Sequence, residues 1–234
     1  MGLWAGVDGC RGGWVMALVD SSRAVAAVHL LRTFGEVAIA AREAELTLAD
    51  IPIGLPSAEC PRLRLCDTLA RERLGARASS VFGVPAREAV WAPSYAEACR
   101  RNERILGREL SKQSWGICPK IREADAVFRL APRLQEAIRE THPEICFRLL
   151  NAGRPLENPK KTTAGRRIRR ELLRGSTENL DAAMKRLPRA APDDLLDAVA
   201  AAVVARMAAE KRAGSVPLAR EYDACGLVME IVGV

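Results

Sequence analysis

Three short apolar runs open the chain and are separated by turns. They span Leu3–Asp8, Trp14–Val19 and Val25–Leu31, and Gly-rich or Ser-Arg segments lie between them. Apolar runs of this length, bounded by turn residues, are typical of β-strands joined by hairpins. The pattern therefore predicts three consecutive strands at the start of the fold.

The next segments change to a helical pattern and back again. Thr33 can cap a helix over Phe34–Glu45, which has an apolar side. Leu46–Ile53 then predicts a fourth strand, which Pro52 interrupts. Residues 61–141 are charged and punctuated by prolines, which predicts a series of helices. We interpret 61–141 as a helical insertion after the fourth strand.

The last third of the chain returns to the sheet. Ile145–Leu149 predicts a fifth strand, and a basic loop and helix follow it. Pro192 opens a long helix to about Arg212, and Leu227–Val232 predicts an edge strand. Because 234 residues suit one large core, we expect a single α/β domain over 1–234, with a mixed sheet flanked by helices.

The composition narrows the partners and the cellular setting. The 36 Lys and Arg against 29 Asp and Glu give a formal charge of +7, which suits a polyanionic partner and also serves solubility. The seven cysteines are scattered, without a Cys-x-x-Cys pair, as expected of reduced thiols. No apolar run approaches the roughly 20 residues of a membrane span. We therefore expect a cytoplasmic protein that does not enter a membrane.

Acidic residues stand beside apolar sequence in four places. Asp8 ends the first predicted strand, Asp50 lies in the fourth, Glu144 precedes the fifth, and Asp194 and Asp197 lie in the last long helix. Buried carboxylates repel one another and lose hydration, so several that converge need a metal ion, shared protons or basic partners. Phosphodiester cleavage is a chemistry often built on such groups.

Each of these acids also has a structural explanation. Asp8 precedes a Gly-rich turn and can hydrogen-bond its own backbone, and Asp50 can do the same at its strand end. One of Asp193 and Asp194 can simply cap the helix that Pro192 opens. Asp197 is harder to explain in this way, because it follows Asp194 by three residues in a helix that is apolar nearly all round.

Glu144 has two interpretations. Pro143 favours an extended backbone, which places Glu144 at the mouth of the predicted fifth strand as a candidate catalytic acid. The alternative is a structural ion pair with an arginine. His142 can in the same way either protonate a leaving group or orient a water, or be a surface histidine.

Basic residues follow the fifth predicted strand. The stretch between Asn158 and Glu171 contains no acid, and it predicts a helix with three arginines on one face. The alternative is an ordinary solvated charged helix. No aromatic residue lies in this stretch, so it does not predict a base-stacking platform. The candidate substrate-binding residues are Lys160, Lys161, Arg166, Arg169 and Arg170, together with Arg11 and Lys112.

Five segments in combination resemble one protein family. They are Trp4–Trp14, Asp50–Leu55, Ser111–Trp115, His142–Phe147 and Asp194–Ala198. Over almost its whole length the chain looks like the domain-of-unknown-function family numbered 429, whose members are described as RNase H-like nucleases. The first and last segments are also similar to Holliday-junction resolvases of the RuvC type, which share a first-strand Asp and a paired Asp in a late helix.

The resemblance implies an RNase H-like fold and a metal site. Asp8 and Asp197 would be metal ligands, with Asp50 and Asp194 as their companions. The resolvases carry Glu at the fourth-strand position where this chain has the shorter Asp50. With Glu144 added from its own position in the sequence, the candidate catalytic residues are Asp8, Asp50, Glu144 and Asp197, and the expected cofactors are two Mg²⁺ or Mn²⁺ ions bridged by Asp8.

The leading hypothesis for function is a metal-dependent phosphodiesterase that hydrolyses nucleic acid. One alternative is a non-catalytic nucleic-acid-binding scaffold whose acids are caps and ion pairs. Another is a nucleotide-binding protein related to the sugar kinases and actin, with the glycines after Asp8 as a phosphate loop. That architecture needs a second Gly-rich loop and a second large domain, and 234 residues are short for it. The pattern does not distinguish DNA, RNA and small nucleotides, and it indicates no oligomeric state.

Overall fold

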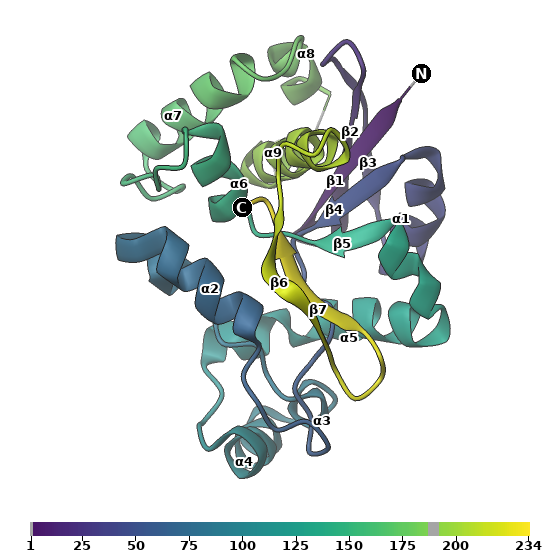
Figure 1. Ribbon diagram of the computed structural model, residues 1–234, viewed down its shortest axis with the longest axis vertical. Coiled ribbons are helices and arrows are strands. Elements are labelled where there is room, and N and C mark those ends of the chain that lie inside the picture. Colours follow the sequence, from purple (N-terminus) through teal and green to yellow (C-terminus); the bar gives the residue numbers. More distant parts are fainter. Residues whose placement is uncertain (1, 187–191) are drawn as a thin grey trace.

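A twisted sheet forms the centre of the protein (Figure 1). The computed structural model describes residues 2–186 and 192–234. In this part of the chain, five strands pair in the order β3-β2-β1-β4-β5. The strands are β1 (Leu3–Cys10), β2 (Gly13–Asp20), β3 (Val25–Leu31), β4 (Leu46–Ala49) and β5 (Ile138–Glu140).

Strand direction changes at β1. β1 pairs antiparallel with β2, and β2 pairs antiparallel with β3, whereas β1–β4 and β4–β5 are parallel pairs. A mixed α/β sheet with this order and these directions is the RNase H-like arrangement. The predicted fold class is therefore confirmed, as are the first three strands.

The turn between β1 and β2 follows from its glycine. Cys10 pairs with Gly13, which leaves Arg11 and Gly12 as a two-residue hairpin loop. Gly12 has a φ of +86°, which costs glycine no steric strain. A positive φ at the second loop residue alone, as in a type II turn, is the conformation that favours glycine at position 12.

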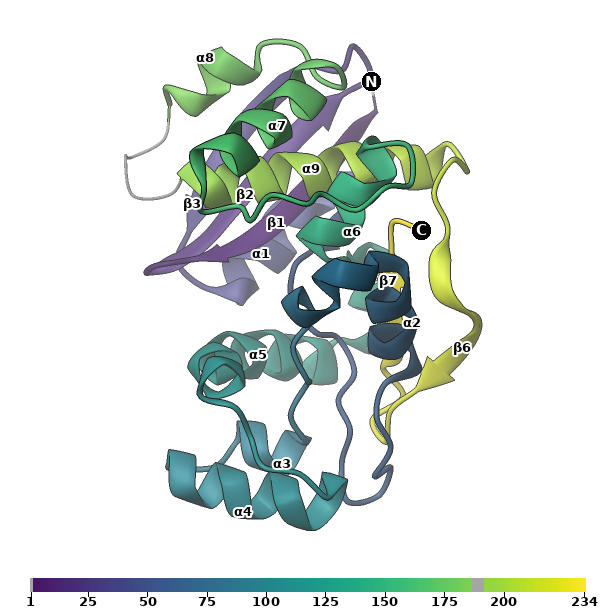
Figure 2. The ribbon, with the colours of Figure 1, turned by 90° about the vertical axis from the view of Figure 1, so that its left-hand side faces the viewer.

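Helices cover both faces of the sheet (Figures 1 and 2). On one face lie α9 and, around it, α6, α7 and α8. On the other side lie α1 and α5, with α3 and α4 packed against α5 further from the sheet, and α2 packs against the small β6–β7 sheet. The elements not yet bounded are α1 (Phe34–Ala40), α2 (Leu65–Leu74), α3 (Arg87–Val90), α4 (Tyr95–Leu106), α5 (Lys112–Leu130), α6 (Pro143–Leu150), α7 (Thr163–Arg174), α8 (Leu180–Met184), α9 (Pro192–Ala209), β6 (Ser215–Tyr222), β7 (Val228–Val232) and the 3-10 helices η1 (Ala41–Glu43), η2 (Gly75–Ser80) and η3 (Pro132–Glu136).

Helix α9 packs against β1 at backbone distance. A Cβ atom added to Gly6 would lie 2.0 Å from the carbonyl oxygen of Ala198 and 2.3 Å from the nitrogen of Ala202. Only glycine on the strand and small residues on the helix allow this approach, which brings the first turns of α9 over the end of β1. Although α9 is strongly apolar, no helix in the described ranges is long and apolar enough to cross a membrane.

The predicted fifth strand is wrong. Residues 143–150 form helix α6 instead. Pro143 occupies the first helical turn, where its missing N–H costs nothing, and the His142 side chain accepts a hydrogen bond from the amide of Glu144 as an N-cap. Periodicity cannot separate a short buried helix from a short buried strand, and here Pro143 is a helix start.

The true fifth strand lies inside the segment expected to be wholly helical. β5 spans Ile138–Glu140 and pairs with β4, so the inserted helices end before it. β4 itself stops at Ala49, shorter than predicted, because Asp50 and Pro52 follow. The predicted edge strand near the C-terminus is β7, but it pairs with β6, which the pattern did not indicate.

Candidate functional site

Asp8 and Asp50 lie at the ends of two neighbouring parallel strands. Alternate residues of a strand face opposite sides of the sheet. Trp4 and Leu48 pack in the core beneath α9, so Asp8 and Asp50, which follow them by even spacings, face the same side. The amide of Asp50 donates a 2.8 Å hydrogen bond to the carbonyl of Val7. The two carboxylates are therefore brought together by the sheet register itself.

Helix α9 adds two further carboxylates. Asp194 lies in its first turn and Asp197 one turn later, on the same face. Asp197 is buried, at 2% exposure, and Asp8 is at 6%. Because Gly6 lets α9 approach β1 closely, these side chains meet the end of the strand. We call Asp8, Asp50, Asp194 and Asp197 the acid cluster.

The electrostatics show that the acid cluster is one unit. Burial raises the pKa of Asp8 well above its ordinary value, and the charges of Asp50, Asp197 and Asp194 raise it further. Burial also raises the pKa of Asp50, although a hydrogen bond with the Asp8 carboxyl opposes this. The pKa of Asp197 rises to about 6, mainly through burial, and burial raises that of Asp194. These acids therefore hold protons more readily than solvated carboxyl groups do.

Lys160 is the cation of this site. It lies in the 151–162 segment between α6 and α7, and its Nζ donates a 2.8 Å hydrogen bond to Oδ2 of Asp197. Burial disfavours its charged form, but the attraction of Asp197, Asp8 and Asp50 outweighs burial and raises the pKa of Lys160. The ammonium is therefore charged at all physiological pH values.

The acid cluster offers the ligands that Mg²⁺ and Mn²⁺ prefer, since carboxylate oxygens are hard donors. Its four carboxylates exceed the one positive charge that Lys160 supplies. In the ranges 2–186 and 192–234, however, no three His, Cys, Asp or Glu side chains are grouped so that they could hold a metal ion. Coulomb interactions act over longer distances than metal–oxygen bonds of about 2.0–2.6 Å. The acids can therefore shift one another's pKa values without meeting at one point where an ion could bind. The cluster fits these ions by its chemistry, and binding requires its side chains to move together.

Glu144 does not join the acid cluster. It lies in the first turn of α6, where its Oε1 accepts a 2.5 Å hydrogen bond from Arg169 and lies 3.4 Å from Arg77. Its other oxygen, Oε2, is buried and has no hydrogen-bond partner among the described residues. This position agrees with the alternative of a structural ion pair, and the mouth-of-strand position expected for Glu144 is wrong because the strand is a helix.

Arg169 is also not where the helical pattern put it. Its side chain is buried, at 2% exposure, and its guanidinium lies over the ring of Phe147. On the same helix, Arg166 is exposed and pairs with Asp193 at 3.0 Å, and Arg170 is half-buried. The expected face of Arg166, Arg169 and Arg170 is therefore split, because Glu144 draws Arg169 inward.

The remaining predicted substrate-binding residues lie on the surface. Arg11, Lys112 and Lys161 are exposed, and their side chains make no ion pair or hydrogen bond with the rest of the described chain. On α7, an open depression is lined by Arg166, Arg170 and three further residues, Thr163, Arg167 and Arg174. A basic surface thus lies along α7, on the side of the sheet that carries the acid cluster.

His142 is committed to the backbone. Its Nδ1 accepts a hydrogen bond from the amide of Glu144, and its Nε2 lies 3.2 Å from the carbonyl of Ser80. These partners assign the neutral tautomer with hydrogen on Nε2. Both ring nitrogens are therefore engaged by the backbone.

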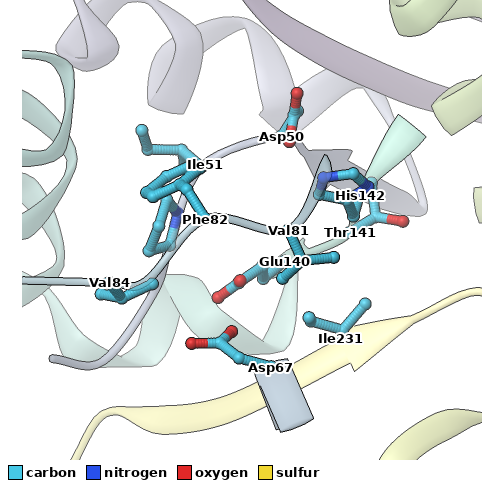
Figure 3. Close-up of a pocket in the computed structure, with 11 residues that line it drawn as sticks. Asp50, Ile51, Asp67, Val81, Phe82, Val84, Glu140, Thr141, His142 and Ile231 are labelled. Carbon is cyan, nitrogen blue, oxygen red and sulfur yellow. The ribbon is translucent and has the colours of Figure 1, made fainter. Parts of the chain in front are cut away.

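A narrow pocket leads from Asp50 into the helical insertion (Figure 3). Its enclosed space is about 20 Å³, room for about one water molecule. At the end away from Asp50, the carboxylates of Glu140 and Asp67 face one another. Arg64 donates a 2.6 Å hydrogen bond to Glu140, and burial raises the pKa of Glu140 to about 8. Sequence reasoning missed this group, because a three-residue strand such as β5 leaves too short a pattern to recognise.

One protein family matches the chain. The family is described as a protein of unknown function, DUF429, and the match covers residues 6–221. The chain belongs to this family. No curated protein and no solved structure matches the chain. The resemblance noted in the sequence is therefore confirmed as membership, while the nuclease function that it implies stays a prediction.

The DUF429 match contains the whole acid cluster. Asp8 lies near its start and Asp197 near its end, and the match also includes Lys160 and the inserted helices. β7, at 228–232, lies outside it. The elements that bring the carboxylates together, β1, β4 and α9, are thus features of the part of the chain that the family describes.

Proposed function

We propose that this DUF429 protein is a metal-dependent phosphodiesterase that cleaves nucleic acid in the cytoplasm. The observation that carries the proposal is the acid cluster: four carboxylates from β1, the end of β4 and α9 share the charge of Lys160. Burying this many acids together costs stability, so they are best explained by a ligand that needs them. The RNase H-like sheet supports the proposal by analogy only, since one fold serves many activities.

Asp8, Asp50, Asp194 and Asp197 would hold two Mg²⁺ or Mn²⁺ ions. When bound, such ions lower the pKa of an attacking water and stabilise the leaving oxygen of a phosphodiester. Asp8 lies in β1, which pairs with β2 on one side and with β4 on the other, and Asp197 lies on a buried helix. Rigid elements of this kind fix donor atoms more accurately than loops do.

The residues around the acid cluster suit a charged substrate. Lys160 and the exposed arginines of α7 provide positive charge on the side of the sheet where the acids lie. Phosphate groups are attracted to such surfaces, and the strength of that attraction depends on salt. His142 contributes no proton in this scheme, because its Nε2–H is donated to Ser80. Its role is to cap α6 beside Asp50.

The first experiment is a calorimetric Mn²⁺ titration of the native protein and of Asp8→Asn. We expect specific binding by the native protein and its loss in the variant, because Asp8 is central to the cluster. Asp193→Asn is the matched control: it removes the same charge from the start of α9, but Asp193 pairs with Arg166 at 3.0 Å. Circular dichroism checks that all three proteins are folded.

The second measurement is cleavage of single-stranded, duplex and branched DNA and RNA with Mn²⁺. We expect hydrolysis by the native protein and by Asp193→Asn, and none by Asp8→Asn. Mn²⁺ binding of similar strength in the native protein and Asp8→Asn would contradict the proposed site. Specific binding without hydrolysis of any substrate would favour a non-catalytic scaffold.

A further inference from the structure

We propose that Lys160 is a built-in counter-cation of the acid cluster, and that a divalent metal ion binds there only when the Lys160 ammonium withdraws. The inference rests on the proposed function, because it concerns the same site, and it adds a form of regulation to it. Metal affinity would then be set partly by the position of one side chain.

The first step is the position of the ammonium. Its Nζ lies 2.8 Å from Oδ2 of Asp197, so it covers one oxygen of the most buried member of the cluster. Lys160 also acts on all four carboxylates, and Arg169 acts on Asp197. Since Coulomb interactions weaken with distance, Lys160 lies near enough to each of the four acids to act on it.

The second step is the conflict between two cations. A divalent ion bound by Asp197 would meet the ammonium at the same carboxylate, and like charges at such short range repel strongly. Within 2–186 and 192–234 no three acids are grouped to hold a metal ion, so the carboxylates have to move together to bind one, and the ammonium paired with Asp197 has to move with them. The ammonium and the metal ion are therefore alternative occupants of one cation position.

The third step is the freedom of Lys160 to leave. It is carried by the 151–162 segment rather than by a helix, and its side chain is 41% exposed. Leu156, at 4% exposure, anchors this segment, and the Thr162 side chain caps α7 at its end. The four-carbon stem of the lysine can therefore turn outward while the segment stays in place. Arg169, at 2% exposure, has no such freedom.

The expected effect follows from the population of the open state. If the ammonium must leave first, the apparent dissociation constant equals the intrinsic constant divided by the fraction of molecules in which it has left. A hydrogen bond to a charged group stabilises the paired position of the ammonium enough to reduce the fraction of molecules in which it has left by about 10- to 100-fold. Because Lys160 is partly solvated, we expect the lower end, about tenfold.

The test is Mn²⁺ affinity measured by calorimetry in four proteins. Lys160→Met should bind Mn²⁺ about tenfold more tightly than the native protein, because the competing charge is gone. Lys160→Arg keeps a positive charge and should bind about as weakly as the native protein. Lys161→Met is the matched control, since Lys161 is exposed and its neighbour in sequence, and its affinity should be unchanged.

A second readout needs no metal. With a chelator present, Lys160→Met should melt at a lower temperature than the native protein, because the cluster then has no counter-charge from Lys160. Added Mn²⁺ should raise the melting temperature of Lys160→Met more than that of the native protein. If Lys160→Met fails to fold, Lys160→Gln removes the same charge and takes its place.

The outcomes separate this inference from the proposed function. Mn²⁺ binding by the native protein with no gain, or a loss, in Lys160→Met would overturn the role of Lys160 and leave the metal site standing. Mn²⁺ binding in none of the four proteins would overturn both. Equal gains in Lys160→Met and Lys161→Met would also overturn the inference, because net charge rather than position would then explain the change.

Discussion

Two groups of carboxylates lie on opposite sides of the sheet and are stabilised in different ways. The acid cluster lies beneath α9, and its acids share the ammonium of Lys160. On the α5 side, Arg87 lies between Asp125 and Asp223, at 3.0 and 2.5 Å. Both groups join distant segments of the chain, so burial and sequence separation alone do not distinguish them.

The difference lies in the hydrogen bonds. The carboxylate of Asp223 accepts from the amides of Leu55, Cys225 and Leu227 as well as from Arg87, and Asp125 accepts from the indole of Trp91. Every oxygen in this group has a donor. In the acid cluster, the one hydrogen bond from a positive group runs from Lys160 to Asp197, within the described residues.

The two groups differ in how the charge of their carboxylates is balanced. A buried carboxylate that stabilises a fold is surrounded by donors, because an unpaired charge is costly to bury. The acid cluster lacks those donors and keeps raised pKa values instead. A cost of this kind is typical of sites prepared for a ligand.

The largest effect on stability is expected from removing Arg87. Arg87→Met leaves Asp125 and Asp223 buried without a counter-charge, and we expect a loss of about 3–5 kcal/mol in the free energy of unfolding. Urea denaturation followed by circular dichroism measures it. The matched control is Arg100→Met, since Arg100 forms an exposed pair with Glu97 and should cost less than about 1 kcal/mol. Similar losses in both variants would mean that the ion pairs of Arg87 with Asp125 and Asp223 do not stabilise the fold more than an exposed pair does.

The acid cluster should make the stability of the protein fall as the pH rises, because Asp197 has a raised pKa in the folded state. The folded pKa of Asp197, about 6, lies above its ordinary value of 3.8, so the folded state holds this proton more tightly than the unfolded state. The stabilisation is complete below about pH 3.8 and is lost as the pH rises through about 6. A difference of about two pKa units corresponds to on the order of 2–3 kcal/mol.

We therefore expect the stability of the metal-free protein, relative to Asp197→Asn, to fall between pH 4 and pH 7. Urea denaturation in chelator over this range measures the difference. Asp193→Asn serves as the control, because Asp193 is half-buried and paired with Arg166. If the difference between the native protein and Asp197→Asn does not change with pH, the burial cost assigned to the cluster is wrong.

The sequence predicted the acid cluster because its members stand at recognisable boundaries. Asp8 ends an apolar run before a Gly-rich turn, Asp50 ends another, and Asp197 interrupts an apolar helix. Such positions depend on local pattern, which a single sequence displays. The family resemblance grouped these acids into one site. The sheet register, which brings Asp8 to Asp50, agrees with that grouping.

What the sequence could not predict depends on partners far away in the chain. Glu144 forms an ion pair because Arg169, 25 positions later, turns inward to meet it. Arg169, Arg166 and Arg170 are alike in the helical pattern, and only tertiary packing separates them. β5 was missed because three residues carry no periodicity, and its burial comes from pairing with β4.

The smallest effect on stability is expected from removing Arg166 and Arg170, which line the open depression on α7, unlike buried Arg169. Arg166 and Arg170 line the open depression, so Arg166→Gln with Arg170→Gln should change the free energy of unfolding by about 0.5 kcal/mol or less for each substitution. The double variant should weaken nucleic-acid binding. It should also reduce the salt slope by about 0.7 for each lost contact to a single strand.

Binding to a labelled oligonucleotide, measured by anisotropy at several salt concentrations, gives that slope. The control is Arg100→Gln with Arg104→Gln, which removes the same charge from exposed positions of α4. If α7 contacts the phosphates, the slope falls only in the α7 variant, because released counterions report direct contacts. Equal changes in both variants would mean that net charge alone attracts nucleic acid. Arg166 and Arg170 would then be no more specific for nucleic acid than the arginines of α4.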